Sequence, residues 1–87
     1  IKNGDYYLAY ENLAALKFTT EKPDDVISFV ENALLRLPNN EKLNTIAALL
    51  YYQTDATDSA KFYAKKAYII NPSQENYFLL QQILKNQ

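Results

Sequence analysis

The sequence has neither cysteine nor histidine, and these two absences exclude most of the sites at which proteins carry out chemistry. Without cysteine the chain can form no disulfide and no thiolate metal site. Without histidine, Ser28, Ser59 and Ser73 have no usual base to activate them as nucleophiles. A single glycine, Gly4, cannot build the glycine-rich loop that holds phosphates. We therefore expect a chain that is not an enzyme and that binds no cofactor.

The carboxylates are the remaining candidates for metal binding or acid–base chemistry. Two acidic pairs, Asp24 with Asp25 and Asp55 with Asp58, lie at predicted helix starts. Capping and interaction with the helix dipole explain acids at such positions better than catalysis does. No acidic stretch has the residue spacing of a calcium-binding loop. We interpret these residues as structural and predict no metal site.

Charge and hydrophobicity exclude two classes of partner. With 9 Lys and Arg against 10 Asp and Glu, the formal net charge is −1, and the pI is about 5.2. Lys61, Lys65 and Lys66 form the one basic cluster, which we interpret as the solvated face of a helix, so we predict no nucleic-acid binding. No apolar run approaches the roughly 20 residues that cross a bilayer, so we predict no membrane insertion.

The sequence does contain a helical pattern with few interruptions. Pro23, Pro38 and Pro72, together with a polar turn at residues 54–58, separate segments in which apolar residues recur every three or four positions. The expected helices cover residues 5–19, 23–37, 41–53, about 59–70 and 73–86, with Asp5 as the cap of the first. No stretch alternates polar and apolar residues over a strand length. We predict one all-α domain over residues 1–87, in which five helices joined by short turns run antiparallel to their neighbours.

Each predicted helix has an apolar stripe that we expect to face the core. The stripes comprise Tyr6, Tyr10, Leu13 and Leu16 in the first helix, Val26, Val30, Ala33 and Leu37 in the second, Leu43, Ile46, Ala47, Leu50 and Tyr51 in the third, Ala60, Ala64, Ala67 and Tyr68 in the fourth, and Tyr77, Leu80 and Leu84 in the fifth, with Leu79 and Ile83 beside this last stripe. We interpret most of the tyrosines as packing residues between helices rather than as ligand contacts.

The sequence also repeats itself at a period of 34 residues. Pro38 and Pro72 are separated by this distance. The same shift superposes Ala14 on Ala48, Leu16 on Leu50, Phe18 on Tyr52, Phe29 on Tyr63 and Ala33 on Ala67. Because turn residues, small residues and aromatics recur together, the pattern indicates a duplicated helix pair. An unrelated five-helix bundle with an accidental period is the alternative.

In these features the chain resembles the tetratricopeptide repeat family, whose unit is a 34-residue helical hairpin. The matching positions are Tyr10, Leu13, Ala14, Lys17, Val26, Val30, Ala33 and Pro38 in the first unit, and Asn44, Ala47, Ala48, Tyr51, Ala60, Ala64, Ala67 and Pro72 in the second. The resemblance implies hairpins stacked as a right-handed solenoid, with repeat one over residues 5–38, repeat two over 39–72 and a closing helix over 73–86. Lys17 and Asn44 depart from the family's aromatic positions, and Val26 replaces a small residue, so we expect an irregular first hairpin.

The resemblance further implies a protein-binding groove lined by the first helix of each unit and by the closing helix. The implied groove residues are Glu11, Ala15, Phe18, Thr45, Leu49, Tyr52, Gln53, Phe78 and Gln82. This set includes one acid and no facing cation, which disfavours capture of a C-terminal carboxylate and suits a segment with apolar and basic side chains. We therefore expect a non-catalytic scaffold that binds a peptide or a partner protein. A module with a vacant groove that only spaces other domains is the alternative.

The predicted closing helix has a wider apolar arc than one neighbouring helix can bury. Its candidates for self-association are Tyr77, Leu80 and Leu84. The arc is expected to be covered by a second copy or by the rest of a longer chain, or the helix itself is swapped or folded across the groove. Another helix of this domain that wraps further around it is the remaining alternative. An accessory or dimerisation domain of a larger enzyme or assembly is accordingly the second functional hypothesis.

Overall fold

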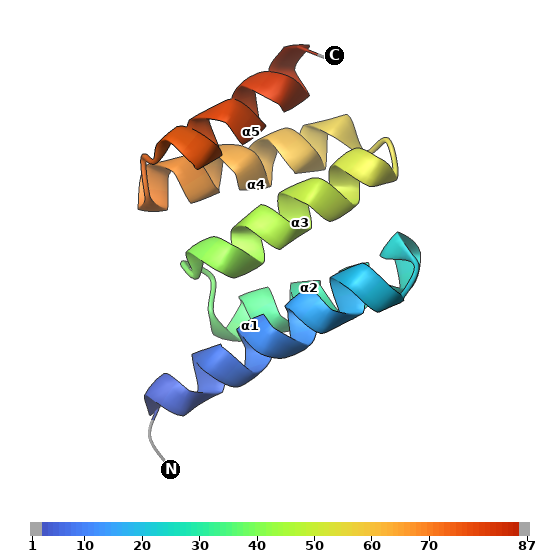
Figure 1. Ribbon diagram of the computed structural model, residues 1–87, viewed down its shortest axis with the longest axis vertical. Coiled ribbons are helices and arrows are strands. Elements are labelled where there is room, and N and C mark those ends of the chain that lie inside the picture. The colour runs from blue at the N-terminus through green and yellow to red at the C-terminus, as the bar shows by residue number, and fades with distance from the viewer. Residues whose placement is uncertain (1–2, 86–87) are drawn as a thin grey trace.

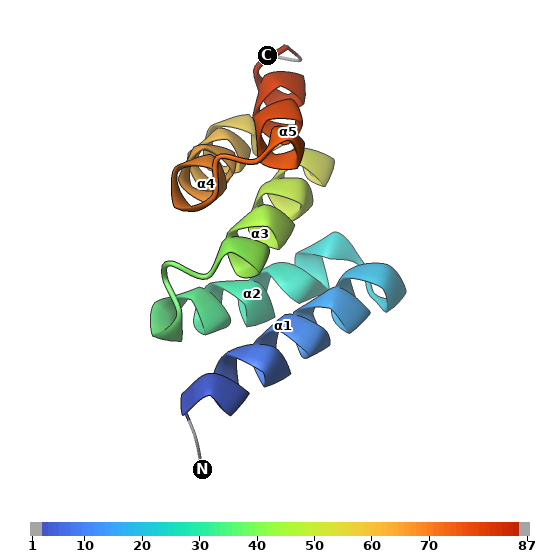
Figure 2. The ribbon, with the colours of Figure 1, turned by 60° about the vertical axis from the view of Figure 1, so that its left-hand side comes forward.

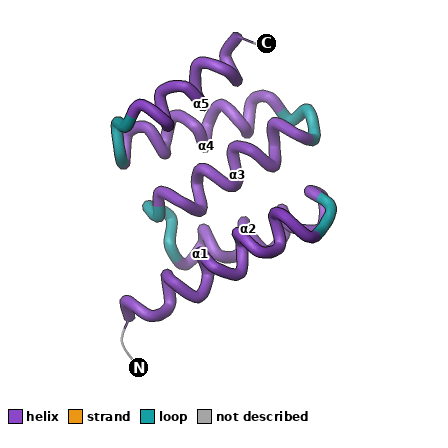
Figure 3. The backbone as a smooth tube through the Cα atoms, in the orientation of Figure 1, coloured by secondary structure: helices purple, strands orange, loops and turns teal. Residues whose placement is uncertain are grey.

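The computed structural model describes residues 3–85, with side chains from residue 7 onward, as five α-helices without a strand in that range. The helices are α1 (Asn3–Thr20), α2 (Pro23–Arg36), α3 (Glu41–Gln53), α4 (Thr57–Ile70) and α5 (Gln74–Lys85). Short turns join them (Figure 3). The all-α class and the five helices are therefore confirmed. The expected roles of the Tyr6 side chain and of residue 86 lie outside the described residues.

Local sequence explains where most of these helices begin. Pro23 is at the first position of α2, where its fixed φ suits the helix and its missing N–H is not needed. The Asn40 side chain accepts a hydrogen bond of 2.9 Å from the backbone N–H of Leu43 and so caps α3. Ser73 Oγ accepts from the N–H of Asn76 at 3.2 Å at the start of α5. The expected capping by Asp5 is wrong, because α1 begins at Asn3 and contains that residue.

The helices are arranged in two layers. Figure 1 and Figure 2 show α1, α3 and α5 following one another along the long axis on one side of the molecule, with α2 and α4 on the other. Each helix packs against the next in sequence, and α1 also packs against α3. The α3–α4 contact is the most extensive and the α1–α2 contact is much smaller, as the expected irregularity of the first hairpin requires. The Lys17 ammonium lies 5.4 Å from the ring centre of Phe29 at that irregular contact.

Two clusters of buried side chains form the core. The first joins α1, α2 and α3 through Ala14, Val26, Val30, Ala33, Leu34, Leu43, Ile46, Ala47 and Leu50. The second joins α3, α4 and α5 through Ala48, Ala60, Ala64 and Ile83. Tyr51 and Tyr63 pack against both clusters and connect them. Since each fully buried Leu, Ile or Val contributes roughly 1.5 to 3 kcal/mol, the first cluster supplies most of the apolar stabilisation.

The 34-residue period relates α2 to α4 in the structure, whereas the starts of α1, α3 and α5 depart from it. α2 and α4 both have 14 residues and start 34 positions apart, and the fully buried positions of α4, Ala60, Ala64 and Ala67, are the shifted equivalents of Val26, Val30 and Ala33. α3 starts 38 positions after α1, and α5 starts 33 positions after α3. The loop before α5, residues 71–73, is one residue shorter than the loop before α3, residues 37–40.

Two of the expected stripes are only partly correct: Tyr10 packs against the first core cluster and Leu80 against the second, but other members are exposed. Leu13 and Leu16 of α1 are 43% and 57% exposed, and Ala14 faces the core instead. α1 is apolar on more than one side, so residue spacing alone does not determine which side is buried. In α5, Ile83 is buried beside the expected stripe, whereas Asn76 is buried unexpectedly and Tyr77 remains 45% exposed. Most members of the stripes expected for α2, α3 and α4 are buried, and the remaining ones, Leu37, Tyr51 and Tyr68, are half-buried.

Candidate functional site

The nine residues implied by the resemblance lie on α1, α3 and α5, which form one layer of the molecule (Figures 1 and 2). Much of this set is engaged in the protein's own packing. Ala15 and Phe18 pack against the first core cluster and Tyr52 against the second. The carboxylate of Glu11 accepts a hydrogen bond of 2.7 Å from Asn40 Nδ2. The groove on this layer stays a prediction.

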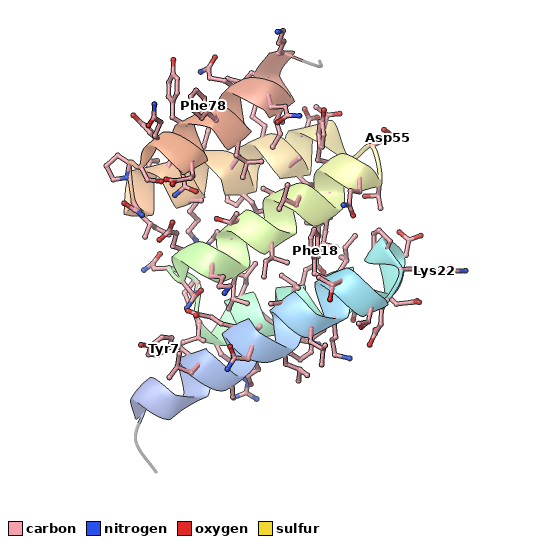
Figure 4. All side chains as sticks on the ribbon, viewed as in Figure 1. Tyr7, Phe18, Lys22, Asp55 and Phe78 are labelled. Carbon is pink, nitrogen blue, oxygen red and sulfur yellow. The ribbon has the colours of Figure 1, made fainter. Side chains whose placement is uncertain are left out.

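The other members of the set are more accessible but scattered. Gln53, Phe78 and Gln82 are exposed, whereas Thr45 and Leu49 are half-buried. Figure 4 shows Phe18 in the space between α1 and α3, and Phe78 on the outer side of α5, far from it. The sequence reasoning therefore named side chains of one layer without identifying a single pocket that unites them.

A groove lies on the opposite layer, between α2 and α4, and we call it the α2–α4 groove. Its volume is about 400 Å³, and it is lined by Ser28, Glu31, Asn32, Leu34, Leu35, Pro38, Phe62, Tyr63 and Lys66. The sequence did not predict this groove, because only the core-facing stripes of α2 and α4 were considered. The available signal was a pair of large apolar residues, Leu35 and Phe62, that fall outside those stripes.

The walls of the α2–α4 groove present large apolar side chains to solvent. Leu35 is 82% exposed and Phe62 is 58% exposed. The ring of Phe62 meets the ring of Tyr63 edge-on, with 5.0 Å between the ring centres. Tyr63 in turn stacks on Tyr51, with centres 5.7 Å apart and an interplanar angle of 6°. Because Tyr51 and Tyr63 also belong to the core, this row of rings holds Phe62 in place at the edge of the groove.

The groove carries one charge of each sign. Glu31 accepts a hydrogen bond from the Tyr51 hydroxyl, which ties this carboxylate to α3. Burial, and secondly the negative charge of Glu31, raises the pKa of Tyr63 above its ordinary value, so Tyr63 stays a neutral phenol at physiological pH. Lys66 lines the groove and forms no ion pair with any residue in the described range 3–85. Its ammonium is therefore available to an acidic ligand.

Two other hollows offer less. The first, about 950 Å³ in volume, lies open at the end of α5 and is lined by Phe78, Gln81, Gln82, Leu84 and Lys85. The second, about 380 Å³, lies where α3 and α5 begin, and its polar groups bind one another. There Glu41 Oε2 accepts hydrogen bonds from Asn71 Nδ2 at 3.1 Å and from Asn76 Nδ2 at 2.9 Å. The first hollow has comparable side chains in Phe78, Leu84 and Lys85, but all of its lining residues lie on α5. The α2–α4 groove differs from it because two helices line it.

Neither metal chemistry nor a bilayer-spanning element is indicated by the residues that the structure describes. No cluster of three or more acidic side chains in that part of the chain could hold a metal ion. None of its helices combines the length and the apolar character that crossing a membrane requires.

No protein-family model, no curated protein and no solved structure matches the chain. The α2–α4 groove and the surfaces that the helices leave exposed are therefore the features that bear on function.

Proposed function

We propose that the chain is a non-catalytic protein-binding scaffold, built as a tetratricopeptide-like solenoid of two hairpins and a closing helix, that binds a peptide segment of a partner in the α2–α4 groove. The observation that carries the proposal is the presence of Leu35 and Phe62, both largely exposed, beside the unpaired Lys66 in one groove. Large exposed apolar residues concentrated at a hollow are typical of protein interaction sites.

The chemistry of the groove defines the ligand class. Leu35 and Phe62 favour an aliphatic or aromatic side chain, which would displace water from their exposed surfaces. Lys66 favours a carboxylate close to that side chain, since the two can form a charge-assisted hydrogen bond. Glu31 is already bonded by Tyr51, so it competes less for Lys66. We therefore propose a short segment in which an apolar residue is followed closely by Asp or Glu.

This ligand differs from the apolar and basic segment expected for the α1–α3–α5 layer. The volume of the α2–α4 groove, about 400 Å³, accommodates a few side chains rather than a whole helix. An interface of this kind buries less than the roughly 1,200 Å² of standard complexes, so the expected affinity is in the micromolar range.

The test is selection of binders from a random peptide display library, followed by affinity measurement with fluorescently labelled peptides. Phe62→Glu should weaken binding at least about tenfold, which corresponds to roughly 1.4 kcal/mol. Phe78→Glu on α5 is a matched control, because the two phenylalanines are 58% and 59% exposed. The control should bind as the unaltered chain does. Lys66→Glu should lower the affinity for acidic peptides and raise the affinity for basic ones.

Three results would contradict the proposal. If the selected peptides lose affinity in Leu49→Arg or Tyr52→Ala but not in Phe62→Glu, the binding face is the α1–α3–α5 layer. If Phe62→Glu and Phe78→Glu act equally, binding is a nonspecific hydrophobic effect. If the library yields no binder at all, the module acts as a spacer.

A further inference from the structure

Between residues 7 and 20, the outward side of α1 carries no charged side chain. Every exposed side chain between residues 7 and 20 lacks a charge; these are Tyr7, Leu8, Ala9, Asn12, Leu13, Leu16, Thr19 and Thr20. Along this side, Ala9, Leu13, Leu16 and Thr20 form a continuous stripe that we call the outer seam of α1. A helix at a protein surface normally has the opposite polarity, with charged side chains toward water.

The charged side chains of α1 in this range are used within the fold. Glu11 is half-buried and accepts a hydrogen bond from Asn40. Lys17 is half-buried, lies over the ring of Phe29 and pairs with Glu21 at 3.3 Å. The side of α1 that faces water is therefore the less polar one, and exposure of this side is unfavourable for the isolated chain.

The 34-residue period identifies the residues of α3 that are equivalent to the outer seam of α1. The shifted equivalents of Ala9, Leu13 and Leu16 are Leu43, Ala47 and Leu50 of α3. Those three α3 residues are between 0% and 1% exposed and pack in the first core cluster against α2. The outer seam is thus the copy, on α1, of a surface that α3 buries against another helix.

We propose that the outer seam of α1 binds the outer seam of a second copy of this chain, so that the two α1 helices pair about a two-fold axis. The spacing of the seam residues, four, three and four positions, is the spacing of a coiled-coil seam. Because residues 7–20 carry no charge on this side, two identical seams meet over this range without like-charge repulsion. A two-fold arrangement also closes the assembly at two copies.

The expected dimer is reversible and weak. α1 has 18 residues, which corresponds to a length of about 27 Å. One pair of helices of this length buries less than the roughly 1,200 Å² of stable complexes, so dissociation is expected at high micromolar concentration. The alternative self-association surface on α5 is smaller than expected, because Leu79 and Leu80 pack against the second core cluster.

The test is the weight-average molar mass of the 87-residue chain, measured by sedimentation equilibrium from about 10 µM to about 1 mM. The mass should rise from 10.0 kDa toward twice that value. Two double variants, Leu13→Glu with Leu16→Glu and Leu13→Lys with Leu16→Lys, should each remain monomeric over the same range. An equimolar mixture of the two should dimerise again, since opposite charges then face each other across the seam.

A matched control distinguishes this seam from other exposed leucines and isoleucines. Leu35→Glu with Ile69→Glu changes residues that are 82% and 78% exposed on the other layer, and should leave the dimer intact. Circular dichroism checks that each variant is helical. The seam variants should keep the peptide binding of the α2–α4 groove, so the two proposals can fail independently.

The proposal is overturned if the chain stays at 10.0 kDa across the range. It is also overturned if the Leu13→Glu with Leu16→Glu variant still dimerises, or if Tyr77→Glu with Phe78→Glu on α5 abolishes dimerisation. The first outcome would mean that the seam receives something other than a second copy, and the others would assign the interface to another surface.

Discussion

At the scale of residues, asparagines organise the junctions between hairpins. Asn44 occupies a position where the tetratricopeptide pattern has an aromatic, and from sequence this departure indicated only irregularity. The structure gives it a role, because Asn44 is fully buried and its Nδ2 donates to the backbone oxygens of Pro38 and Asn40. Asn76 has the corresponding role before α5. Neither role could be predicted, since each depends on carbonyl groups that the fold brings to the side chain.

We expect Asn76→Ala to lower the free energy of unfolding by about 1 to 3 kcal/mol. Asn76 is 4% exposed, and its Nδ2 donates to Glu41 Oε2 at 2.9 Å, to the oxygen of Ala67 at 3.2 Å and to that of Asn71 at 2.9 Å. The measurement is urea denaturation followed by circular dichroism. The exposed Asn32 is the control, and Asn32→Ala should change stability by less than about 0.5 kcal/mol. Equal effects of the two variants would show that the buried hydrogen bonds contribute nothing.

Stability above neutral pH should depend on Tyr63. Because burial and then Glu31 raise its pKa above 10.0, the folded protein holds this proton more tightly than the unfolded chain. The protonated Tyr63 therefore contributes to the free energy of unfolding. This contribution is complete below about pH 10 and is lost as the pH rises through the higher pKa of the folded state. Tyr63→Phe should therefore show a shallower decline in the free energy of unfolding between about pH 9 and pH 11. Glu31→Gln should reduce the decline only partly, since burial is the larger cause. Identical slopes for Tyr63→Phe and the unaltered chain would refute this assignment.

At the scale of elements, the central helices were predictable and the terminal ones were not. The expected stripes of α2, α3 and α4 have neighbouring helices on their side, so spacing identifies most of the buried face. The apolar residues outside these stripes, such as Leu35 and Phe62, remain exposed. α1 has apolar residues on two sides, and its neighbours select Ala14 rather than Leu13 or Leu16. The α2–α4 groove depends on the separation of two helices that are not consecutive, and the spacing of residues within one helix carries no information on it.

The alanine stripe of α4 yields a prediction about helix packing. Ala64 is fully buried in the second core cluster, beside Ala48 and Ile83, where its small size permits close approach of the helices. Ala64→Leu should destabilise the protein by about 1 to 3 kcal/mol through overpacking. Lys65→Leu introduces the same side chain at the adjacent exposed position and should have little effect. Thermal and urea unfolding of both variants provide the comparison, and a tolerated Ala64→Leu would mean that the helix interface is loosely packed.

At the scale of the whole molecule, α3 is the element on which the others depend. It packs against α1, α2 and α4, and six of its residues are buried. It contributes to both core clusters, which Tyr51 and Tyr63 connect. α1 and α5 lie at opposite ends of the long axis, with neighbours on one side only (Figure 1). Opening at either end therefore leaves the centre intact, whereas opening of α3 requires global unfolding.

Native-state hydrogen exchange should reveal this order. Amides of α3 should exchange slowest, at rates that correspond to global unfolding, and those of the first turns of α1 and of α5 should exchange fastest. The reason is that the central helix is covered on several sides, while the end helices are covered on one. Measurement by NMR as a function of urea would resolve the individual helices. Protection that is uniform over all five helices would instead indicate a single cooperative unit.

The short loop at residues 71–73 has a consequence for building longer arrays from this chain. Each residue of an α-helix turns the chain by about 100° around the helix axis. Because α5 starts 33 and not 34 positions after α3, the missing residue determines which side of α5 faces the core as well as where the helix starts. Inserting a residue after Pro72 would restore a uniform period but would turn Ile83 out of the second cluster and move Asn76 away from its acceptors. An engineered concatemer therefore needs a 34-residue step within the array and a 33-residue step at its last helix.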